Sequence, residues 1–553
     1  MNVMNKGIIR KLTCTMTVVS YCLAALTFLA CSDDDVVGDP ARDWGGSAES
    51  FTPVDEKGFS TYFTPTLGTV GDPMPFYDKR AGDFKVLYLK ESTANLAYRY
   101  HPIWGVSTAD GANYRSMGEV LPYGDNDYQQ DAALGTGCCY YNEQDGLYYL
   151  YYTGHNGDAK KPETWKAQYV EAVMRATSPD MKTWTRDNLW QLNGADYGYS
   201  TTDFRDPQIF VADDGLYHMV IATYPSYGGD PKFAEFKSGD MRSWQHVGQF
   251  NMVWDRMCEC PDIFKMGDWW YFVYSDSDKQ NWSRKVKYMM APSWDALKAC
   301  FDNPGANWPN DGKEGVLDSR GFYAGKTASN GADRFIWGWC PFRSGGDIHE
   351  KNVNVGGGGG NEPNWSGALV CHKVVQHSDG TLTLGEVPGI RAKYGRQQEV
   401  RVMADHGYQN GTLSGDDAYV LFGRLDYHNH ISLTVTTSNN WDKFGISLVR
   451  GTDSEKYYTM VVNPENENWR KINFEQEGMS GKGFIEGIDG YGFPRPADNV
   501  YHIDIYTDNS VMVMYVNDNV CYTQRIYGIQ KNCWSVNNYG GSVTVSDVRV
   551  SQY

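Results

Sequence analysis

The sequence predicts an all-β protein, a five-bladed β-propeller followed by a C-terminal β-sandwich. Aromatic residues make up 14% of the chain and glycine is abundant, whereas few windows carry apolar residues at helical spacing. Short alternating runs separated by Gly, Asp and Asn recur along the chain, and one motif repeats at blade-sized steps. Both observations favour strands over helices throughout.

The repeated motif is a Gly or Asp turn that leads into an aromatic-rich strand. Its markers are Phe84, Tyr148, Tyr217, Trp270 and Phe335, and the steps between them are 64, 69, 53 and 65 residues. A four-stranded blade cannot bury both of its faces alone, so several blades must stack around an axis, and five fit this length. A sandwich or barrel with similar hairpins is the alternative, and the regular spacing disfavours it.

The strand eleven or twelve residues ahead of each marker is the expected innermost strand of its blade. Three of these strands carry an acid followed by a proline, in the segments Asp72-Pro73, Asp206-Pro207 and Glu259-Cys260-Pro261. The equivalent places in the other two blades are near Thr136 and Tyr323, which carry no carboxylate. Because innermost strands converge on the propeller axis, we expect the three acids to gather in one funnel.

Clustered carboxylates repel one another, and a purely structural protein gains nothing from them. They perturb one another's pKa values in the way that acid–base chemistry requires. A proline at these places forgoes a ladder hydrogen bond, as expected where a strand begins. A single Asp-Pro is a common turn, but three acids in register of a repeat are difficult to explain as turns. The pattern therefore predicts a catalytic site.

The last third of the chain has clean strand alternation, in the segments Tyr501–Tyr506 and Ser510–Asp518. With nearly five hundred residues after the leader, two domains are expected. We place the propeller at residues 61–392 and the sandwich at 393–553.

The first thirty residues differ from the rest. Lys6, Arg10 and Lys11 precede an apolar run that stops at Cys31, which predicts a signal peptide over residues 1–30 and a lipid-modified Cys31. A single-pass membrane helix is the alternative. Residues 31–60 have the composition of a solvated tether. The acidic run after Cys31 resembles the export signal of Bacteroides-type surface lipoproteins, so an outer-membrane lipoprotein on the cell surface, or one facing the periplasm, is expected.

The formal net charge of −18 repels phosphate backbones, so nucleic acid is not an expected partner and neutral sugars suit the surface better. Of the twelve cysteines, Cys14 and Cys22 leave with the signal and Cys31 takes the lipid. The remaining nine show no paired CxxC spacing and no His clusters, so no metal site, no cofactor and no assigned disulfide are predicted.

At its acid motifs the chain resembles glycoside hydrolase family 32, the fructan hydrolases and invertases, whose blades carry an early Asp-Pro, a central Arg-Asp-Pro and a Glu-Cys pair. Further matches are Leu317-Asp318 leading to Gly321–Ala324, then Ile336–Trp339, Asn364–Leu369 and Asp379–Leu382. The resemblance covers most of residues 61–553, and its combination of motifs is specific.

The resemblance implies roles for individual residues. Asp72 is the nucleophile, Glu259 the acid/base, and Asp206 holds sugar hydroxyls and stabilises the transition state, as in retaining glycosidases. Arg205 is expected to bind substrate and fix the local charge balance. Three aromatic residues are expected to line the sugar pocket, although most tryptophans of a propeller pack between blades: Trp104, Tyr323 and Trp339.

The chain departs from the family around Asp72. Thr69-Val70-Gly71-Asp72-Pro73-Met74-Pro75 lacks the usual Trp and both Asn of the first motif, and Lys90 or Glu91 stands where a Gln is usual. The terminal-sugar subsite is therefore expected to be reshaped. Five glycines after Val355 predict a loop that could border the cleft.

The leading hypothesis is a retaining β-fructosidase that cleaves levan, inulin or fructo-oligosaccharides through a covalent fructosyl-enzyme intermediate. Fructosyl transfer uses the same intermediate with a sugar acceptor instead of water. Two further hypotheses stay open at this point, a non-catalytic glycan-binding lipoprotein and a five-bladed-propeller glycosidase of arabinan type. An oligo- or polysaccharide is the expected partner in every case.

Overall fold

The computed structural model describes residues 61–65, 68–91, 101–125, 129–157, 169–253, 257–276, 285–302, 315–343, 363–440, 442–450, 457–464, 472–477, 483–484, 495–518 and 520–553. The predicted signal peptide, tether and five-glycine loop lie outside these residues. No helix among the described residues is long and apolar enough to cross a membrane.

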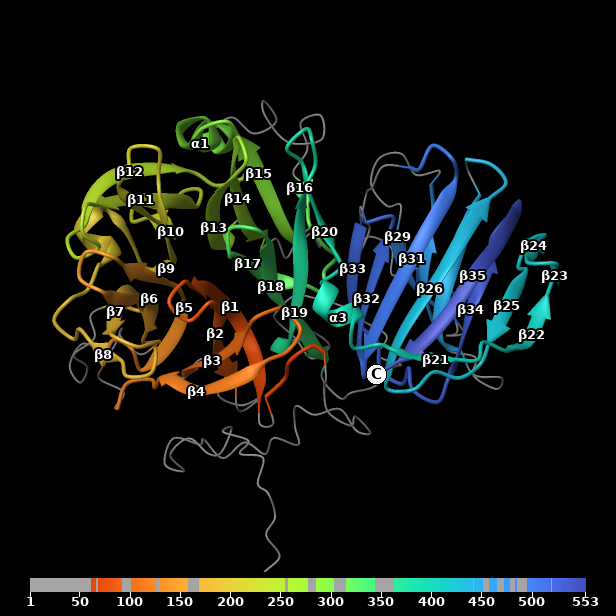
Figure 1. Ribbon diagram of the computed structural model, residues 1–553. Helices are drawn as coiled ribbons and strands as arrows, with labels where there is room; N and C mark the ends of the chain where they lie inside the picture. The colour runs from red at the N-terminus through yellow and green to blue at the C-terminus, as the bar shows by residue number, and fades with distance from the viewer. Residues whose placement is uncertain are drawn as a thin grey trace, which may run out of the picture.

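Between Thr69 and Gly385 the chain forms antiparallel strands in successive groups of four (Figure 1). The groups are β1 (Thr69–Asp78), β2 (Asp83–Glu91), β3 (Ile103–Thr108), β4 (Arg115–Leu121); β5 (Ala133–Asn142), β6 (Leu147–His155), β7 (Glu171–Ser178), β8 (Thr185–Arg186); β9 (Tyr199–Val211), β10 (Tyr217–Pro225), β11 (Lys232–Ser238), β12 (Gln245–Asn251); β13 (Cys258–Met266), β14 (Trp269–Asp276), β15 (Val286–Ala291), β16 (Gly315–Val316); and β17 (Tyr323–Ser329), β18 (Arg334–Arg343), β19 (Pro363–Gln376), β20 (Leu382–Gly385). We call residues 69–385 the propeller.

The first strands of the groups lie next to one another in a closed ring. β1 contacts β5, β5 contacts β9, β9 contacts β13, β13 contacts β17, and β17 contacts β1. The first and last groups share one sheet because Val70 of β1 pairs with Gly367 of β19. The repeated turn-and-aromatic motif forms the hairpin between the first two strands of each group. Because the first strands of all groups contact one another around the ring, residues far apart in the chain meet near its centre.

Aromatic side chains, the repeat markers among them, supply much of the packing between neighbouring groups. Phe84 lies edge-on to Phe335 with ring centroids 5.5 Å apart, which joins the first group to the last. Phe233 and Phe272 join the third and fourth groups at 4.7 Å. Helix α1 (Trp294–Asp302) adds Trp294 and Phe301 to the same cluster. The aromatic-rich composition is thus used mainly to fill the spaces between sheets.

The remaining strands form two facing sheets, which we call the sandwich (Figure 1). One sheet holds β21 (Arg396–Gln398), β23 (Tyr408–Gln409), β24 (Thr412–Ser414), β26 (His428–Thr437), β31 (Val500–Asp508), β32 (Val511–Val516), β33 (Val520–Arg525) and β35 (Ser542–Gln552). The other holds β22 (Val402–His406), β25 (Tyr419–Phe422), β27 (Phe444–Arg450), β28 (Tyr457–Val462), β29 (Ile472–Glu477), β30 (Gly483–Phe484) and β34 (Cys533–Asn538). The short helix α3 (Pro388–Arg391) precedes them.

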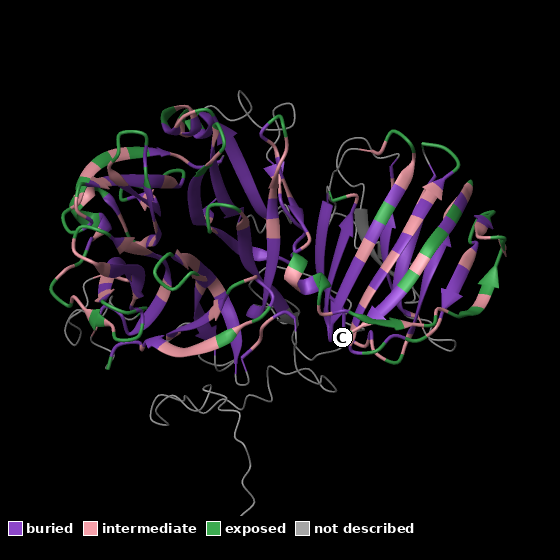
Figure 2. Cartoon of the chain, viewed as in Figure 1, coloured by how far each residue is buried: buried purple, intermediate pink, exposed green. Residues whose placement is uncertain are grey.

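Strand alternation explains the sandwich. Along β26 every second residue is buried, and Figure 2 shows the same alternation on the strands that face the viewer. The buried positions form one apolar core between the sheets, with Trp534 stacked on Phe422 at a centroid distance of 4.4 Å. The all-β class predicted from the sequence is confirmed.

Candidate active site

The three predicted acids lie on three strands of the inner ring, Asp72 on β1, Asp206 on β9 and Glu259 on β13. The register of the inner strand shifts at this place, between Gly71 and Met74 on β1 and between Glu259 and Asp262 on β13. A β-bulge redirects side chains and increases the local twist. The bulges therefore turn the acids out of the ordinary strand alternation.

Backbone strain accompanies these bulges. Asp72 has a φ of 32° and Asp206 a φ of 60°, and Cys260, next to Glu259, has a φ of 52°. L-residues with side chains rarely adopt these values inside a strand, and such residues gather at functional sites. The proline that follows Asp72 or Asp206 removes a ladder hydrogen bond at the point where the register breaks.

Each carboxylate oxygen of Asp72 accepts a hydrogen bond from a side chain of a different group of strands. Thr136 Oγ1 donates to Oδ2 at 2.7 Å and Trp339 Nε1 donates to Oδ1 at 3.0 Å. Burial raises the pKa of Asp72, the two hydrogen bonds oppose that shift, and the carboxylate of Glu259 raises the pKa further. The two donors hold the carboxylate in one orientation.

Asp206 is a deeply buried acid, with only 4% of its surface exposed. Its Oδ2 accepts a hydrogen bond from the backbone N–H of Cys260 at 2.8 Å, which ties β9 to β13. Burial raises the pKa of Asp206 to about 7 despite the opposing charge of Arg205, and Glu259 and Asp72 raise it as well. The charges of the three acids are therefore coupled.

Glu259 is a more accessible acid, with a quarter of its side chain exposed. Tyr323 donates its hydroxyl hydrogen to Oε2 at 2.8 Å, and Arg205 Nη2 lies 3.4 Å from Oε1. A group that exchanges protons with water must be reached by water, and this exposure suits that task.

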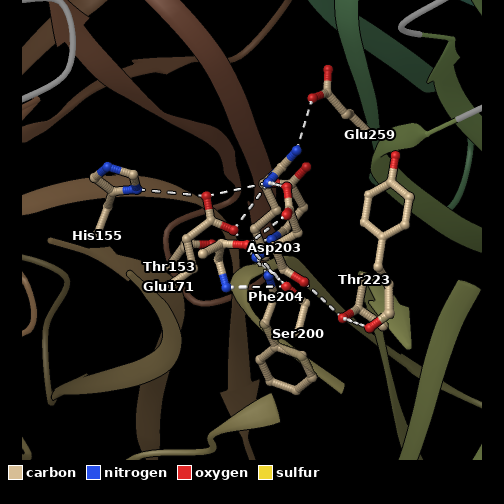
Figure 3. A network of polar contacts seen from close by, with 12 residues as sticks. Thr153, His155, Glu171, Ser200, Asp203, Phe204, Thr223 and Glu259 are labelled. Carbon is tan, nitrogen blue, oxygen red and sulfur yellow. Dashed lines mark hydrogen bonds and ion pairs between the residues drawn. The ribbon is translucent and has the colours of Figure 1, made fainter. Parts of the chain in front are cut away.

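Arg205 bonds to several carboxylates, and Figure 3 shows this polar network with Glu171, Asp203 and Glu259 labelled. Its Nη1 donates to Glu171 at 3.0 Å and to Asp203 at 3.0 Å, while Nη2 faces Glu259. Burial alone would lower the pKa of Arg205, but Glu171, Glu259, Asp206 and Asp203 raise it well above its usual value. The guanidinium stays charged and offsets part of the surrounding negative charge.

Glu171 is a member of this network that sequence reasoning missed. Its carboxylate accepts the backbone N–H of Phe204 at 2.9 Å and faces His155 (Figure 3). Its pKa is lowered although burial acts in the opposite direction, because Arg205 and His155 favour the charged form. It stands 34 residues from Arg205 at the start of β7, so no local motif could have indicated it.

A second residue that sequence reasoning missed, His101, lies on the Asp72 side next to Glu91. His101 Nε2 and Glu91 Oε2 are 2.9 Å apart, and His101 is close enough to Asp72 to lower the pKa of that carboxyl. Glu91 occupies the region where the sequence lacks the family's usual Gln. The acid and imidazole therefore give this end of the site a different set of polar groups.

The three predicted pocket aromatics have different surroundings. Tyr323 and Trp339 lie edge-on at 5.5 Å, and each hydrogen-bonds one of the acids. Trp104 is 4% exposed within the propeller core, and Lys90 Nζ lies over its ring at 3.5 Å. Tyr323 and Trp339 are buried as deeply, at 3% and 2% exposed, so all three rings pack within the propeller and their sugar contacts stay predictions.

Asp318, His372 and Cys521 form another buried polar cluster, at the contact between propeller and sandwich. Cys521 Sγ lies 3.4 Å from Nδ1 and 3.7 Å from Nε2 of His372. Because Sγ is nearly equidistant from both ring nitrogens, it lies off the lone-pair axis of either one. The distances describe a hydrogen-bond network better than ligands around a shared ion. All nine cysteines of residues 138–533 are free thiols.

Sequence comparison identifies the fold and family. The model described as "Glycosyl hydrolases family 32 N-terminal domain" matches residues 62–384, and the one described as "GH32, BT1760-like, C-terminal domain" matches residues 380–550. The chain belongs to glycoside hydrolase family 32. Membership makes it a glycoside hydrolase and confirms the resemblance seen in the acid motifs.

Two curated relatives from Escherichia coli cover most of the chain. Sucrose-6-phosphate hydrolase is 20% identical over 458 residues, which are 78% of this chain and 83% of the relative. Raffinose invertase is 24% identical over 450 residues, 78% of this chain and 82% of the relative.

Solved structures of family members share the architecture. Sucrose-6-phosphate hydrolase from Lactobacillus gasseri superposes with a TM-score of 0.65 at 15% identity, over 89% of this chain and 92% of that one. Exo-inulinase from Aspergillus awamori gives a TM-score of 0.65 at 13% identity, over 91% and 98%. These neighbours combine a β-propeller with a β-sandwich, and at this identity the likeness concerns the fold.

Proposed function

We propose that the protein is a retaining β-fructosidase that cleaves levan, inulin or fructo-oligosaccharides. The observation that carries the proposal is the meeting of Asp72, Asp206 and Glu259 on strands of the inner ring, with electrostatic coupling among all three. Retaining glycosidases need two carboxyl groups about 5 Å apart, one as nucleophile and one as acid/base.

Each acid takes the role that its surroundings favour. Asp72, held at both oxygens by Thr136 and Trp339, attacks the anomeric carbon and forms the fructosyl-enzyme bond. Glu259, the accessible acid, gives its proton to the leaving oxygen and then takes a proton from the attacking water. The leaving sugar departs as an alcohol, and hydrolysis returns Asp72 as a carboxylate.

Asp206 binds sugar hydroxyls of the bound fructosyl ring. With a pKa of about 7 it can accept or donate a hydrogen bond near neutral pH. Arg205 keeps Glu259 oriented while Glu171 and Asp203 hold the guanidinium. Burial of these charges is unfavourable alone, so the network itself supports a catalytic rather than a structural role.

The blade number is part of the proposal. We interpret each group of four strands as one blade, because the first strands of the groups contact one another in a closed ring. Five blades then surround the axis, followed by the sandwich, with boundaries near residues 392 and 393.

The test is incubation of the purified protein with levan, inulin and sucrose, with released fructose and oligosaccharides separated by chromatography. Fructose or fructo-oligosaccharides from at least one substrate are expected. The ratio of transfer to hydrolysis products distinguishes water from sugar as the acceptor. No product from any of the three would reject the fructan proposal.

We also propose that the protein is a lipoprotein of the outer membrane, displayed on the surface and anchored at Cys31. The apolar run ending at Cys31 and the acidic segment after it support this location. Labelling with a fatty-acid analogue should modify the wild type and not Cys31→Ala, and protease treatment of intact cells should remove the wild-type protein. A wild-type protein that takes up no label and stays in solution without detergent would contradict the anchor.

A further inference from the structure

One strand of the sandwich, β33, contacts the propeller at several residues, among them Cys521, Thr523 and Arg525. The first contact considered for the site involves Thr523, which is fully buried. Its backbone N–H and its hydroxyl both donate to Asp318, at 2.8 Å and 2.6 Å, and Ser319 Oγ donates to its carbonyl oxygen. Three hydrogen bonds therefore join one sandwich residue to two consecutive propeller residues.

The second contact involves Arg525, which is 1% exposed. Its Nη2 donates to the carbonyl oxygen of Cys340 at 2.7 Å and its Nε to that of Pro341 at 3.0 Å. Its Nη1 donates to Ser510 Oγ within the sandwich at 2.9 Å. The planar guanidinium thus fixes the backbone of β18 relative to the sandwich.

Both contacts lie beside residues that hydrogen-bond the acids. The segment after Ser319 runs directly into Tyr323, the donor to Glu259, and Cys340 follows Trp339, the donor to Asp72. The first segment packs tightly against β33, because a Cβ on Gly321 would lie 2.1 Å from the carbonyl oxygen of Thr523. The two segments are also in close contact, since a Cβ on Gly338 would lie 2.6 Å from the ring of Phe322.

We infer that β33 is a structural support of the active site, in which Thr523 and Arg525 are positioning residues for Tyr323 and Trp339. The inference rests on the proposed roles of Glu259 and Asp72. It assigns to the sandwich a part in the reaction, because the buried residues of β33 act on the acids through Tyr323 and Trp339. The two hydrogen bonds to the acids depend on donors whose backbones are held from the other domain.

The test compares Thr523→Val and Arg525→Met with Trp339→Phe, using the full chain and the substrate that the wild type cleaves best. Trp339→Phe removes a donor that lowers the pKa of Asp72, so the acid limb of kcat/KM should move to higher pH. Arg525→Met should move it in the same direction by less. Because small displacements of catalytic groups are costly, kcat should fall roughly 10-fold in Thr523→Val and up to about 100-fold in Arg525→Met.

Two further variants separate positioning from general stability. Arg525→Lys keeps a donor for one carbonyl oxygen and should restore part of the rate. Thr459→Val is the matched control, because Thr459 is also a fully buried sandwich threonine, bonded to Ser447 at 2.7 Å on β27 of the other sheet. It should leave kcat and the acid limb unchanged even where it lowers the melting temperature.

A readout independent of activity is hydrogen exchange of the native protein, followed by mass spectrometry of peptides that contain Tyr323 or Trp339. Exchange there should quicken in Thr523→Val and Arg525→Met and not in Thr459→Val. Unchanged exchange in both Thr523→Val and Arg525→Met overturns the inference even if the fructosidase proposal holds. An acid limb of kcat/KM that does not move in Arg525→Met overturns it as well. A wild type inactive on fructans that still shows the exchange pattern would reject the proposed function and retain the structural support by β33.

Discussion

The propeller and the sandwich are both built from antiparallel strands, but they place polar groups in opposite ways. At the centre of the propeller, Asp72 and Asp206 have raised pKa values and strained backbones inside their strands. In the sandwich core, Ser447 and Thr459 form a neutral pair of buried side chains at 2.7 Å. Buried charge at the propeller centre therefore coincides with the proposed chemistry, whereas backbone strain occurs in both domains, since buried Val449 of β27 has a φ of 64°.

The largest expected effect is the loss of turnover when either reacting acid is removed. Asp72→Asn and Glu259→Gln should each lower kcat by roughly 10⁴-fold or more, because each takes away an essential chemical step. Steady-state rates on the preferred fructan measure this. Asp262→Asn is the matched control, since Asp262 is a buried acid of the same ring whose carboxylate accepts hydrogen bonds from Thr327 at 2.6 Å and from Gln208 at 3.3 Å. Near-normal rates in either catalytic variant would refute the assignment.

The opposite behaviour is expected in the sandwich core. Trp534→Ala removes a ring that is 1% exposed and stacked on Phe422, so it should cost about 3–5 kcal/mol of unfolding free energy. Denaturant unfolding measures this loss. Below the unfolding transition kcat should stay within a few-fold of the wild type, because Trp534 lies in the other sheet from β33. A large loss of kcat in fully folded protein would show that the whole sandwich core, and not β33, supports the site.

Asp206→Asn should make the protein more stable and less active. The folded pKa of about 7 is higher than the usual 3.8, so the stability linked to this group is complete below pH 3.8 and is lost as the pH rises through 7. The difference between these two pKa values, about 3, corresponds to at most about 4 kcal/mol in favour of the variant above pH 7. Melting temperatures at pH 5 and pH 8 check the sign, and a variant less stable than the wild type at pH 8 would contradict it.

The smallest change in free energy is expected when the hydrogen-bond donor to Glu259 is removed. Tyr323→Phe keeps the ring against Trp339 and removes the hydrogen bond of 2.8 Å, so kcat should fall about 10- to 100-fold with the fold unchanged. Rates and melting temperature together test this. An unaltered kcat would mean that Arg205 alone orients Glu259.

Local patterns predicted most of the architecture because strand alternation and repeated hairpins are properties of short segments. The acids were predictable for the same reason, since each lies eleven or twelve residues before the aromatic marker of its repeat. Thr136 and Tyr323 were found as the equivalent positions without an acid, and the structure shows that each donates a hydrogen bond to one. Repeat position thus indicated the site beyond the acids themselves.

Interactions between distant segments could not be predicted in this way. Glu171 and His101 carry no signal of their own, and no local pattern indicates that Lys90 Nζ lies over the ring of Trp104. The contacts of Thr523 with Asp318 join residues 205 positions apart. Nothing in a short segment indicates which side chain of another segment will lie opposite it.

The order of residues was sufficient to specify strands, their repeated grouping and the places of three acids, because backbone hydrogen bonding and burial act over a few residues at a time. The pKa values, the orientation of Glu259 and the support from β33 arise only when the ring closes and the two domains meet. Those properties depend on distances across space, and burial then makes each charge sensitive to every neighbour within a few ångströms.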